Sequence, residues 1–499
     1  MLEKIDHFLV LMLENRSFDH VLGGLRALDA RIDGVSEGAY SNRLDPESPA
    51  SPVFASRRAT RFDLPFDPGH EFADIQTQIF GSPAAAAPAM SGFVKSARNS
   101  ARSDADAGRV MEFFAPEQLP VISTLAREFA VFNHWHASLP GPTWPNRFFV
   151  HAATSGGLTA SPDTASTIAG FSFPNGTIFD RIGASKAPDG RRRTWRIYHG
   201  GLPQTAGIGS LRGEFINPFT ERFCDMDSFE EDLAQDAFPD YVFIEPRYDT
   251  GNQFRDGDSM HPLNDARKGE ALVKRVYEAL RSSRHWESSL LVVTFDEHGG
   301  FFDHVSPPPA VPPDEDRRYA TPGVDFRFDR LGVRVPAILV SPYTARGTVI
   351  GAQPGPPYDH ASILASVESR FGLAALTDRD RHAPTLEAAL NLDHPRAGPD
   401  DAPLRLPEPG RDNFLVRMGT AIRQWIGEKR DPPELSAIET THLALAHGCY
   451  LAALHADQQT DDGARASFAG IGSDPKRAAM YLEECDRHLR ERRRRRRRP

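Results

Sequence analysis

The strongest constraint on the fold is a repeated alternation of short apolar segments with amphipathic ones along the first 390 residues. Between the apolar segments, hydrophobic residues recur at helical spacing over residues 269–283 and 360–373. Strands that alternate with helices indicate a mostly parallel sheet covered on both faces, which is an α/β fold. The segments that have the length and composition of buried strands are residues 4–15, 129–135, 194–200, 240–246, 289–295 and 336–342.

A proline-rich segment, residues 394–412, divides the chain into two predicted parts. It has five prolines and no periodicity, which is typical of a linker, and we expect few contacts to cross it. Beyond it, residues 413–427 and 434–456 have helical patterns. The predicted organisation is a catalytic domain over 1–393, a linker over 394–411, a small helical region over 412–490 and an arginine-rich tail over 491–499.

Charge is distributed unevenly along the chain. The formal net charge of −10 argues against non-specific nucleic-acid binding by the body of the protein, so no nucleic-acid partner is expected. Seven consecutive arginines, Arg492 to Arg498, stand near the C-terminus. This tail is either a solvated appendage or a means of recruitment to an anionic surface such as a membrane.

The cysteines, the apolar stretches and the N-terminal segment together indicate the cellular compartment that we expect for the protein. The three cysteines have no metal-site spacing and form no disulfide framework, so they are compatible with a reducing environment. No stretch approaches the roughly 18 apolar residues of a membrane span. The N-terminal segment lacks a basic region and a small-residue cleavage site, so no signal peptide is evident. We expect a cytoplasmic or peripheral membrane protein, unless a leader has been lost.

Polar pairs follow two of the predicted strands at the point where each strand ends. Glu14 and Asn15 follow the first, and Asp296 and Glu297 follow the strand over 289–295. Ligands of open α/β sheets collect at the carboxyl ends of strands, and carboxylate and amide oxygens suit a hard divalent cation. The alternative is that each pair ends a strand with solvated polar groups.

A third candidate lies in the segment "SLPGPTWPNRFFVHAATSGG" at residues 138–157. Thr143 stands before a predicted helix that has Pro145 in its first turn. A hydroxyl there faces unpaired backbone N–H groups and the positive end of the helix dipole, where a phosphate binds readily. The alternative is that Thr143 only caps the helix.

Several blocks together resemble a known family. They are "ENRSFDHVLG" (14–23), "DPGHEF" (67–72), the segment around Thr143, "TFDEHGGFFDHVSPP" (294–308), "FDRLGVRVPAILVSP" (328–342) and "YDHASI" (358–363). Their order is similar to that in the phosphoesterase family of bacterial phospholipases C and acid phosphatases, and most similar to the plant non-specific phospholipases C. The resemblance covers about residues 1–390 and implies an alkaline-phosphatase-like fold.

The resemblance implies roles for individual residues. Thr143 matches the nucleophile, for which the phosphatase branch has serine. The residues that match the metal ligands are Glu14, Asn15, Asp296 and Glu297, and the metal would be one Ca²⁺, Mg²⁺ or Mn²⁺ ion. The histidines that match the substrate side are His70, His261, His304 and His360. One departure concerns His261, because Ser259 and Met260 precede it where relatives carry acidic or histidine residues.

The implied function is non-specific phospholipase C activity. Glycerophospholipids such as phosphatidylcholine and phosphatidylethanolamine would be cleaved to diacylglycerol and a phosphorylated headgroup through a phospho-threonine intermediate. An acid phosphatase would use the same residues on a phosphomonoester. A third possibility is a binding protein recruited by its arginine tail, although the presence of every block argues against a non-catalytic role.

The block at 294–308 also makes local predictions. Gly299 and Gly300 would let the backbone turn tightly beside the cation. Phe301 and Phe302 would pack beneath the loop rather than face lipid. Asp303 would either orient a histidine or stabilise the turn.

Overall fold

The computed structural model describes residues 1–497 with gaps. The residues outside the description are 83, 84, 86, 218, 251–253, 352–354, 399, 411–436 and the last two of the chain. The helix predicted over 413–427 therefore lies outside the described residues, as do the side chains of 493–499.

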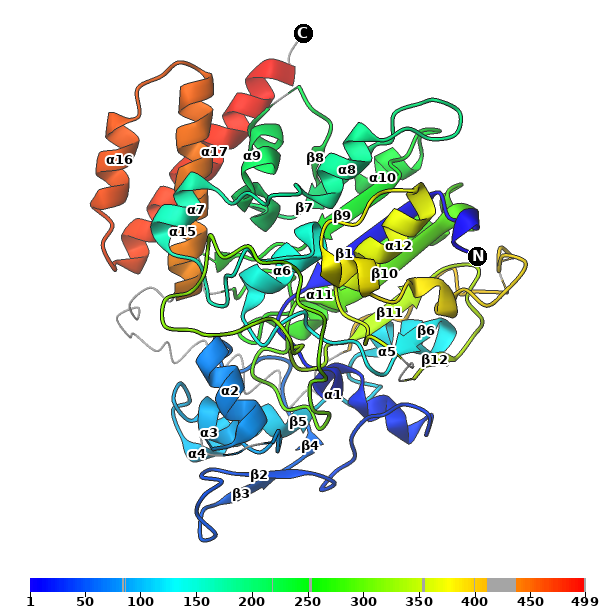
Figure 1. Cartoon of the computed structure of the whole chain (residues 1–499), viewed down its shortest axis with the longest axis vertical. Helices are drawn as coiled ribbons and strands as arrows, with labels where there is room; N and C mark the ends of the chain where they lie inside the picture. Colours follow the sequence, from blue (N-terminus) through cyan, green and yellow to red (C-terminus); the bar gives the residue numbers. More distant parts are fainter. Residues whose placement is uncertain are drawn as a thin grey trace.

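A single eight-stranded sheet forms the centre of the part that is described (Figure 1). The strand order is β12-β6-β11-β10-β1-β9-β7-β8, and only the two pairings of β11 are antiparallel. The mostly parallel α/β prediction is thus confirmed. The strands are β1 (His7–Leu13), β6 (Ala130–Phe132), β7 (Trp195–His199), β8 (Phe223–Asp225), β9 (Tyr241–Glu245), β10 (Ser289–Phe295), β11 (Ala337–Val340) and β12 (Thr348–Ile350).

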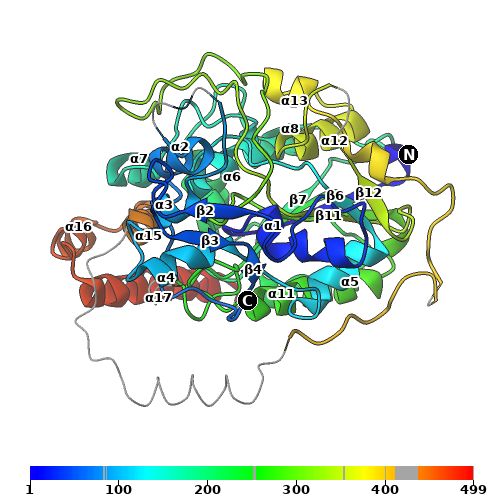
Figure 2. The same cartoon turned by 90° about the horizontal axis from the view of Figure 1, so that it is seen from below.

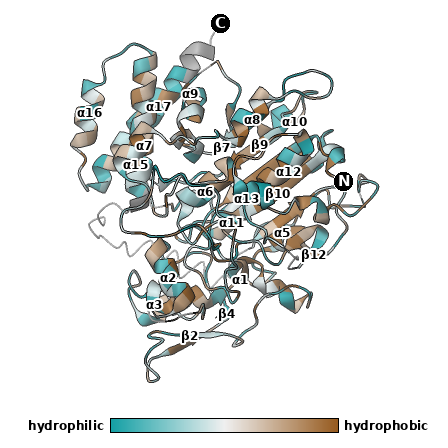
Figure 3. Ribbon diagram, viewed as in Figure 1, coloured by the Kyte–Doolittle hydropathy of each residue, from teal (hydrophilic) through white to brown (hydrophobic). Residues whose placement is uncertain are grey.

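All six predicted strands belong to this sheet; β10 has the predicted bounds and the other five are shorter than predicted. The sequence analysis missed the edge strands β8 and β12, which have three residues each and too little apolar sequence to stand out. β1 and β10 lie in the middle of the sheet and are buried almost completely. Figure 3 shows the apolar character concentrated in these central strands.

Helices cover both faces of the sheet (Figure 2). The helices predicted after Thr143, over 269–283, over 360–373 and over 434–456 are all present, as α6 (Thr143–Ala152), α11 (Ala266–Arg281), α12 (Ala361–Phe371) and α15 (Ala437–Ala456). On one face lie α6 (Thr143–Ala152), α8 (Ile178–Ala184) and α12 (Ala361–Phe371). On the other lie α5 (Pro120–Glu128), α10 (Phe229–Leu233) and α11 (Ala266–Arg281).

A smaller layer lies next to α1 (Phe18–Val21), to its left and below it in Figure 1. Its elements are β2 (Ser41–Arg43), β3 (Val53–Ala55), β4 (Arg57–Arg58), α2 (Phe72–Phe80), α3 (Phe93–Ala97), α4 (Asp104–Ala107) and β5 (Glu112–Phe113). Phe301 and Phe302 pack into the apolar cluster of this layer and are at most 5% exposed, which confirms that they lie beneath the loop.

The C-terminal helices pack on the body of the protein. They are α15 (Ala437–Ala456), α16 (Asp462–Ala469) and α17 (Pro475–Arg497), and α15 packs against α7 (Thr164–Ala169) and α9 (Gly209–Ile216). Leu445, Cys449 and Leu489 belong to the same apolar core as the sheet. None of the helices described has the length and apolar content of a membrane span.

The predicted linker also contacts the body. The hydroxyl of Tyr277 on α11 donates to the carbonyl of Pro403, and the Arg281 guanidinium donates to the carbonyl of Gly398 at 2.7 Å. The expectation that few contacts cross this boundary is therefore wrong, because Ala402 and Leu406 of the linker and Leu445 and Leu489 of the C-terminal helices belong to the apolar core of the sheet. The division into separate domains remains a prediction.

Candidate active site

The two polar pairs meet at one edge of the sheet. β1 and β10 are parallel and in register, with Leu13 opposite Phe295. Glu14 and Asp296 therefore leave adjacent strands at the same level, and both are at most 2% exposed. The alternative that each pair is a solvated strand end does not fit this burial.

Three donors hold the carboxylate of Asp296. Its Oδ1 accepts from the backbone N–H of Asn15 at 3.1 Å and of Glu297 at 2.7 Å. Its Oδ2 accepts from Nε of Arg147 at 3.0 Å. Asp296 is thus oriented by both strand ends and by a helix on the face of the sheet.

Thr143 is the first residue of α6, and the residue in the capping position is Pro142. The Thr143 hydroxyl donates to Oδ1 of Asn15 at 3.3 Å and is buried with it. The side chain therefore faces the strand end of β1. Pro145 lies in the first turn of the helix, as predicted.

The oxygens of this cluster fit a hard cation. Across the described part of the chain, Oε2 of Glu14 and Oε1 of Glu297 are buried and lack hydrogen-bond partners. Burial raises the pKa of both carboxyl groups to about 8, with the neighbouring Asp296 charge adding to the rise. Carboxylate, amide and hydroxyl oxygens are the donor types that suit Ca²⁺, Mg²⁺ or Mn²⁺. Within the described residues, however, the acidic and histidine ligand atoms that all lie within 4.8 Å of one another are those of Asp19, Asp303 and His304, not those of Glu14, Asp296 and Glu297.

The glycine turn after β10 brings its backbone against the strand end of β1. Gly299 and Gly300 have φ angles of 63° and 71°, in the left-handed region that glycine adopts without strain. A Cβ at Gly299 would lie 2.1 Å from the carbonyl oxygen of Asn15. The prediction of a tight turn at this position is confirmed.

His70 and His261 share a carboxylate neighbour, Asp67. Nε2 of His261 lies 3.6 Å from Oδ2 of Asp67, and the imidazole stacks on Phe254 with ring centroids 3.7 Å apart. The nearby carboxylates of Glu297 and Asp67 raise the pKa of His70 to about 9 although burial opposes this. Nδ1 of His70 donates to the carbonyl of Pro68 at 2.8 Å, which leaves Nε2 for a proton transfer.

Ser259, one of the two residues that depart from the family pattern before His261, contacts the cluster directly. Its carbonyl accepts from the Glu14 backbone N–H at 2.8 Å, and its hydroxyl accepts from the His261 backbone N–H at 3.3 Å. Ser259 is fully buried. The departure therefore replaces an ionisable side chain with a neutral one beside Glu14.

His360 contacts the backbone of Asp296. Its Nε2 donates to the carbonyl of Asp296 at 2.7 Å, and its Nδ1 accepts from the indole N–H of Trp135 at 3.4 Å. Burial lowers the pKa of His360, which keeps the ring neutral. Because both nitrogens are engaged, this histidine orients Asp296 in the present arrangement.

His304 lies in a second charged cluster. Its Nδ1 contacts Asp19 at 2.7 Å and its Nε2 contacts Asp33 at 3.2 Å. The Arg334 guanidinium bonds Asp303 at 2.8 Å and Asp19 at 3.1 Å. Asp19, Asp303 and His304 lie close enough to one another to hold a metal, but Arg334 already supplies the positive charge there. Asp303 thus pairs with Arg334, and its Oδ1 also accepts from the backbone N–H of Val305 at 3.0 Å, which supports the turn-stabilising alternative.

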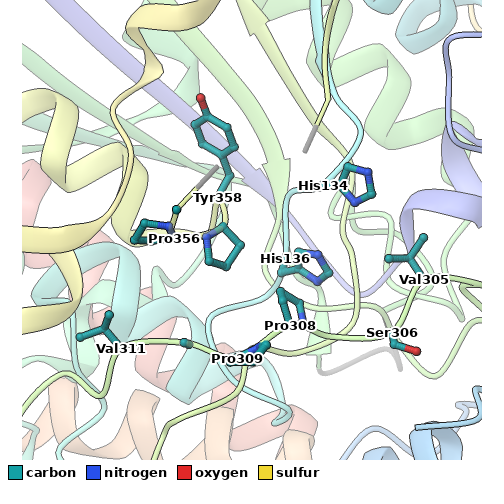
Figure 4. Close-up of a pocket in the computed structure, with 12 residues that line it drawn as sticks. His134, His136, Val305, Ser306, Pro308, Pro309, Val311, Pro356 and Tyr358 are labelled. Atoms are coloured by element: carbon teal, nitrogen blue, oxygen red, sulfur yellow. The ribbon is translucent and has the colours of Figure 1, made fainter. Parts of the chain in front are cut away.

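A cavity of about 500 Å³ lies beside this second cluster (Figure 4). His134 and His136, on the segment after β6, form one wall, and Tyr358 forms another. Most of the remaining lining is proline and small aliphatic side chains, namely Val305, Pro308, Pro309, Ala310, Val311, Pro356 and Pro357.

Sequence reasoning missed several residues of the site. Arg147 stands one helical turn after Thr143, and a charge within an otherwise apolar helix was the available signal. His442 of α15 contacts the rings of Trp144 and Tyr248, with centroids 6.3 and 5.5 Å away. No pattern near Thr143 could have indicated a contact with a helix 300 residues further along the chain.

Comparison with known proteins decides the family. Residues 5–374 match the model of the phosphoesterase family, which is most of the chain. The chain belongs to this phosphoesterase family. It is therefore a hydrolase of phosphoric esters, and the matched residues include the sheet and the whole cluster around Asp296.

Named relatives agree with this assignment. The phosphoesterase is 40% identical to Non-specific phospholipase C3 of Arabidopsis thaliana, over 81% of this chain and 76% of the relative. It is 25% identical to Phospholipase C A of Mycobacterium tuberculosis, with 74% of each chain covered. A solved structure from the alkaline phosphatase superfamily of Vibrio parahaemolyticus matches with a TM-score of 0.32 at 13% identity, over 55% of this chain and 66% of that one.

Proposed function

We propose that this phosphoesterase is a phospholipase C that cleaves glycerophospholipids, such as phosphatidylcholine and phosphatidylethanolamine, into diacylglycerol and a phosphorylated headgroup. The similarity to proteins named non-specific phospholipases C supports the substrate class. The observation that carries the proposal is the hydrogen bond from the Thr143 hydroxyl, at a helix N-terminus, to the side chain of Asn15. Among the described residues, buried oxygens of Glu14 and Glu297 have no hydrogen-bond partner.

Thr143 is the nucleophile in this proposal. Its hydroxyl gives up its proton to solvent water, and its Oγ forms a bond to phosphorus while the bond between phosphorus and the glycerol oxygen breaks. The glycerol oxygen takes up a proton and leaves as diacylglycerol. Water then attacks phosphorus and breaks its bond to Thr143, one proton of that water returns to Oγ, and the phosphorylated headgroup leaves. The backbone N–H groups at the start of α6 are suited to stabilise the non-bridging oxygens.

The residues that would hold one divalent cation, Ca²⁺, Mg²⁺ or Mn²⁺, are Glu14, Asn15, Asp296 and Glu297. Such a cation, when bound, screens the phosphate charge and favours loss of the Thr143 proton. Glu14 and Glu297 have free oxygens for this purpose, within the described residues, while Asp296 is held in place by its donors.

His70 is the best candidate for the proton donor to the leaving oxygen. Its Nδ1–H is fixed on the carbonyl of Pro68, and the carboxylates around it favour the protonated ring. His360 and His304, in contrast, have both ring nitrogens hydrogen-bonded. We assign them to the support of the site. Burial and the charge of His70 lower the pKa of His261 well below its usual range, so His261 would act beside His70 as a neutral ring rather than as a second proton donor.

Product analysis tests this function. The full-length protein is incubated separately with phosphatidylcholine, phosphatidylethanolamine and a soluble phosphomonoester, and the products are identified by mass spectrometry. We expect diacylglycerol with phosphocholine or phosphoethanolamine. Phosphate released from the monoester, with both phospholipids left intact, would show an acid phosphatase instead. Phosphatidic acid as the lipid product would contradict cleavage at the glycerol side.

A further inference from the structure

Arg147 is a fully buried cation inside the candidate active site. It lies on α6 four residues after Thr143, so both side chains emerge from the same face of the helix. Its side chain is 1% exposed. An arginine at this depth is costly unless its charge and its N–H groups are used.

The guanidinium joins the two strand ends. Its Nε donates to Oδ2 of Asp296 at 3.0 Å, at the end of β10. Its Nη2 donates to the carbonyls of Met12 and Leu13 at 3.3 and 3.2 Å, which are the last two of β1. One planar group therefore ties the Asp296 carboxylate to the backbone that directly precedes Glu14.

A second layer holds the guanidinium itself. The Tyr248 ring lies 5.3 Å from Cζ of Arg147, within the range of a cation–π contact. The Tyr248 hydroxyl donates to Oε2 of Glu245 at 2.7 Å. Glu245 is fully buried and also accepts from the backbone N–H groups of Gln204 and Thr205. The chain from Glu245 to Asp296 is continuous.

A gain in folding stability is a poor explanation for the burial of Arg147. Nη1 of Arg147 is buried and has no hydrogen-bond partner in the described part of the chain. A buried ion pair with an unsatisfied N–H is weak evidence of a gain in folding free energy. The hydrogen bonds that are made all converge on the orientation of Asp296 and of the end of β1.

We infer that Arg147 is a positioning residue, which fixes the carboxylate of Asp296 and the end of β1 in the geometry that a divalent cation requires. This inference rests on the cation site of the proposed function. Hydrogen-bonded partners of metal-binding carboxylates set ligand orientation, and their loss commonly costs about 10–100-fold in metal affinity. Lysine keeps the charge but is a single point donor, so it does not reproduce the three bonds of the guanidinium.

Arg147→Lys tests the inference through metal binding rather than activity. Metal-stripped full-length protein is titrated with Mn²⁺, and free Mn²⁺ is followed by its electron paramagnetic resonance signal. We expect R147K to bind Mn²⁺ about 10–100-fold more weakly than the wild type. R212K is the matched control, because Arg212 is 6% exposed and, among the described residues, donates to the backbone carbonyls of Ala206, Ile168 and Thr167 alone. It should bind like the wild type.

Two further measurements keep the test decisive. In R147A, added guanidinium should restore Mn²⁺ affinity and methylammonium should not. If R147K proves unfolded by circular dichroism, Y248F replaces it, since it removes only the hydroxyl that fastens the aromatic ring to Glu245, and we expect a smaller loss of affinity. Unchanged Mn²⁺ binding in folded R147K, or in Y248F where that variant replaces it, would overturn the role of Arg147. A wild type that binds none of Mn²⁺, Mg²⁺ and Ca²⁺ would overturn the proposed cation site as well.

Discussion

At the scale of single residues, the carboxyl groups of Glu14 and Glu297 make the proposed cation site sensitive to pH. Their raised pKa values mean that the folded, metal-free protein holds protons which the unfolded chain releases above about pH 4.5. These two groups therefore lower the free energy of unfolding as pH rises toward 8. A cation binds only the ionised forms, so its stabilising effect grows over the same range.

We accordingly predict that the increase in Tm caused by saturating Mn²⁺ is larger at pH 8 than at pH 6. Differential scanning fluorimetry with and without the metal measures this difference directly. E14Q should reduce both the metal-induced increase and its dependence on pH. An increase in Tm that is equal at the two pH values would argue against these carboxylates as ligands.

The sequence indicated which residues belong to the cluster around Asp296, but not the hydrogen bonds that join them. Glu14 and Asp296 could be placed together because the carboxyl ends of parallel strands share one edge of the sheet. The bond between Arg147 and Asp296 depends on how α6 docks across β1, which no local pattern encodes. His304 shows the same limit, because its contacts with Asp19 and Asp33 involve loops distant in the sequence.

At the scale of elements, the turn after β10 is where sequence and structure agree most closely. The paired glycines could be predicted from their place after a buried strand, since a side chain there would be strained. The edge strands β8 and β12 could not, because short strands gain their stability from pairing with the sheet rather than from their own sequence.

We predict that Gly299→Ala destabilises the protein by more than the about 1–3 kcal/mol that a left-handed backbone costs a non-glycine residue. The added Cβ would meet the Asn15 carbonyl at 2.1 Å and displace a proposed ligand. G323A is the control, since Gly323 has a φ of 78° and open space around it. Urea unfolding compares the two. Equal losses of stability would show that the close approach to Asn15 has no effect.

At the scale of the whole molecule, the C-terminal helices complete the wall beside Thr143. α15 shares the apolar core of the sheet, and His442 on it contacts Trp144, the residue after Thr143. We predict that a chain ending at residue 410 has a lower Tm and reduced hydrolysis of a short-chain phospholipid. Thermal unfolding and a product assay measure these effects. Unaltered values for both would show that the catalytic domain is independent of these helices.

The first arginine of the tail differs from those that follow it. Nε of Arg492 donates to Asp457 at 2.8 Å, so this first arginine is docked on the protein and is neither solvated nor available to an anionic surface. We propose that the remaining arginines contact anionic membranes, each contributing about 1 kcal/mol near the surface. Removal of residues 493–499 should weaken binding to phosphatidylserine vesicles at low salt and leave short-chain hydrolysis unchanged. If the full-length protein and the truncated protein bind these vesicles equally in a sedimentation assay, this role of the arginines is refuted.

The most direct test of the proposed chemistry is detection of the covalent intermediate on Thr143. The wild type and T143A are mixed with phosphatidylcholine, quenched in acid within the first turnover and digested for mass spectrometry. We predict a phosphocholine adduct on Thr143 in the wild type, and no adduct and no turnover in T143A. T344A, which removes a buried hydroxyl that donates to the carbonyl of Ala389, should behave like the wild type. Normal turnover by T143A, or an adduct on another residue, would contradict the proposal.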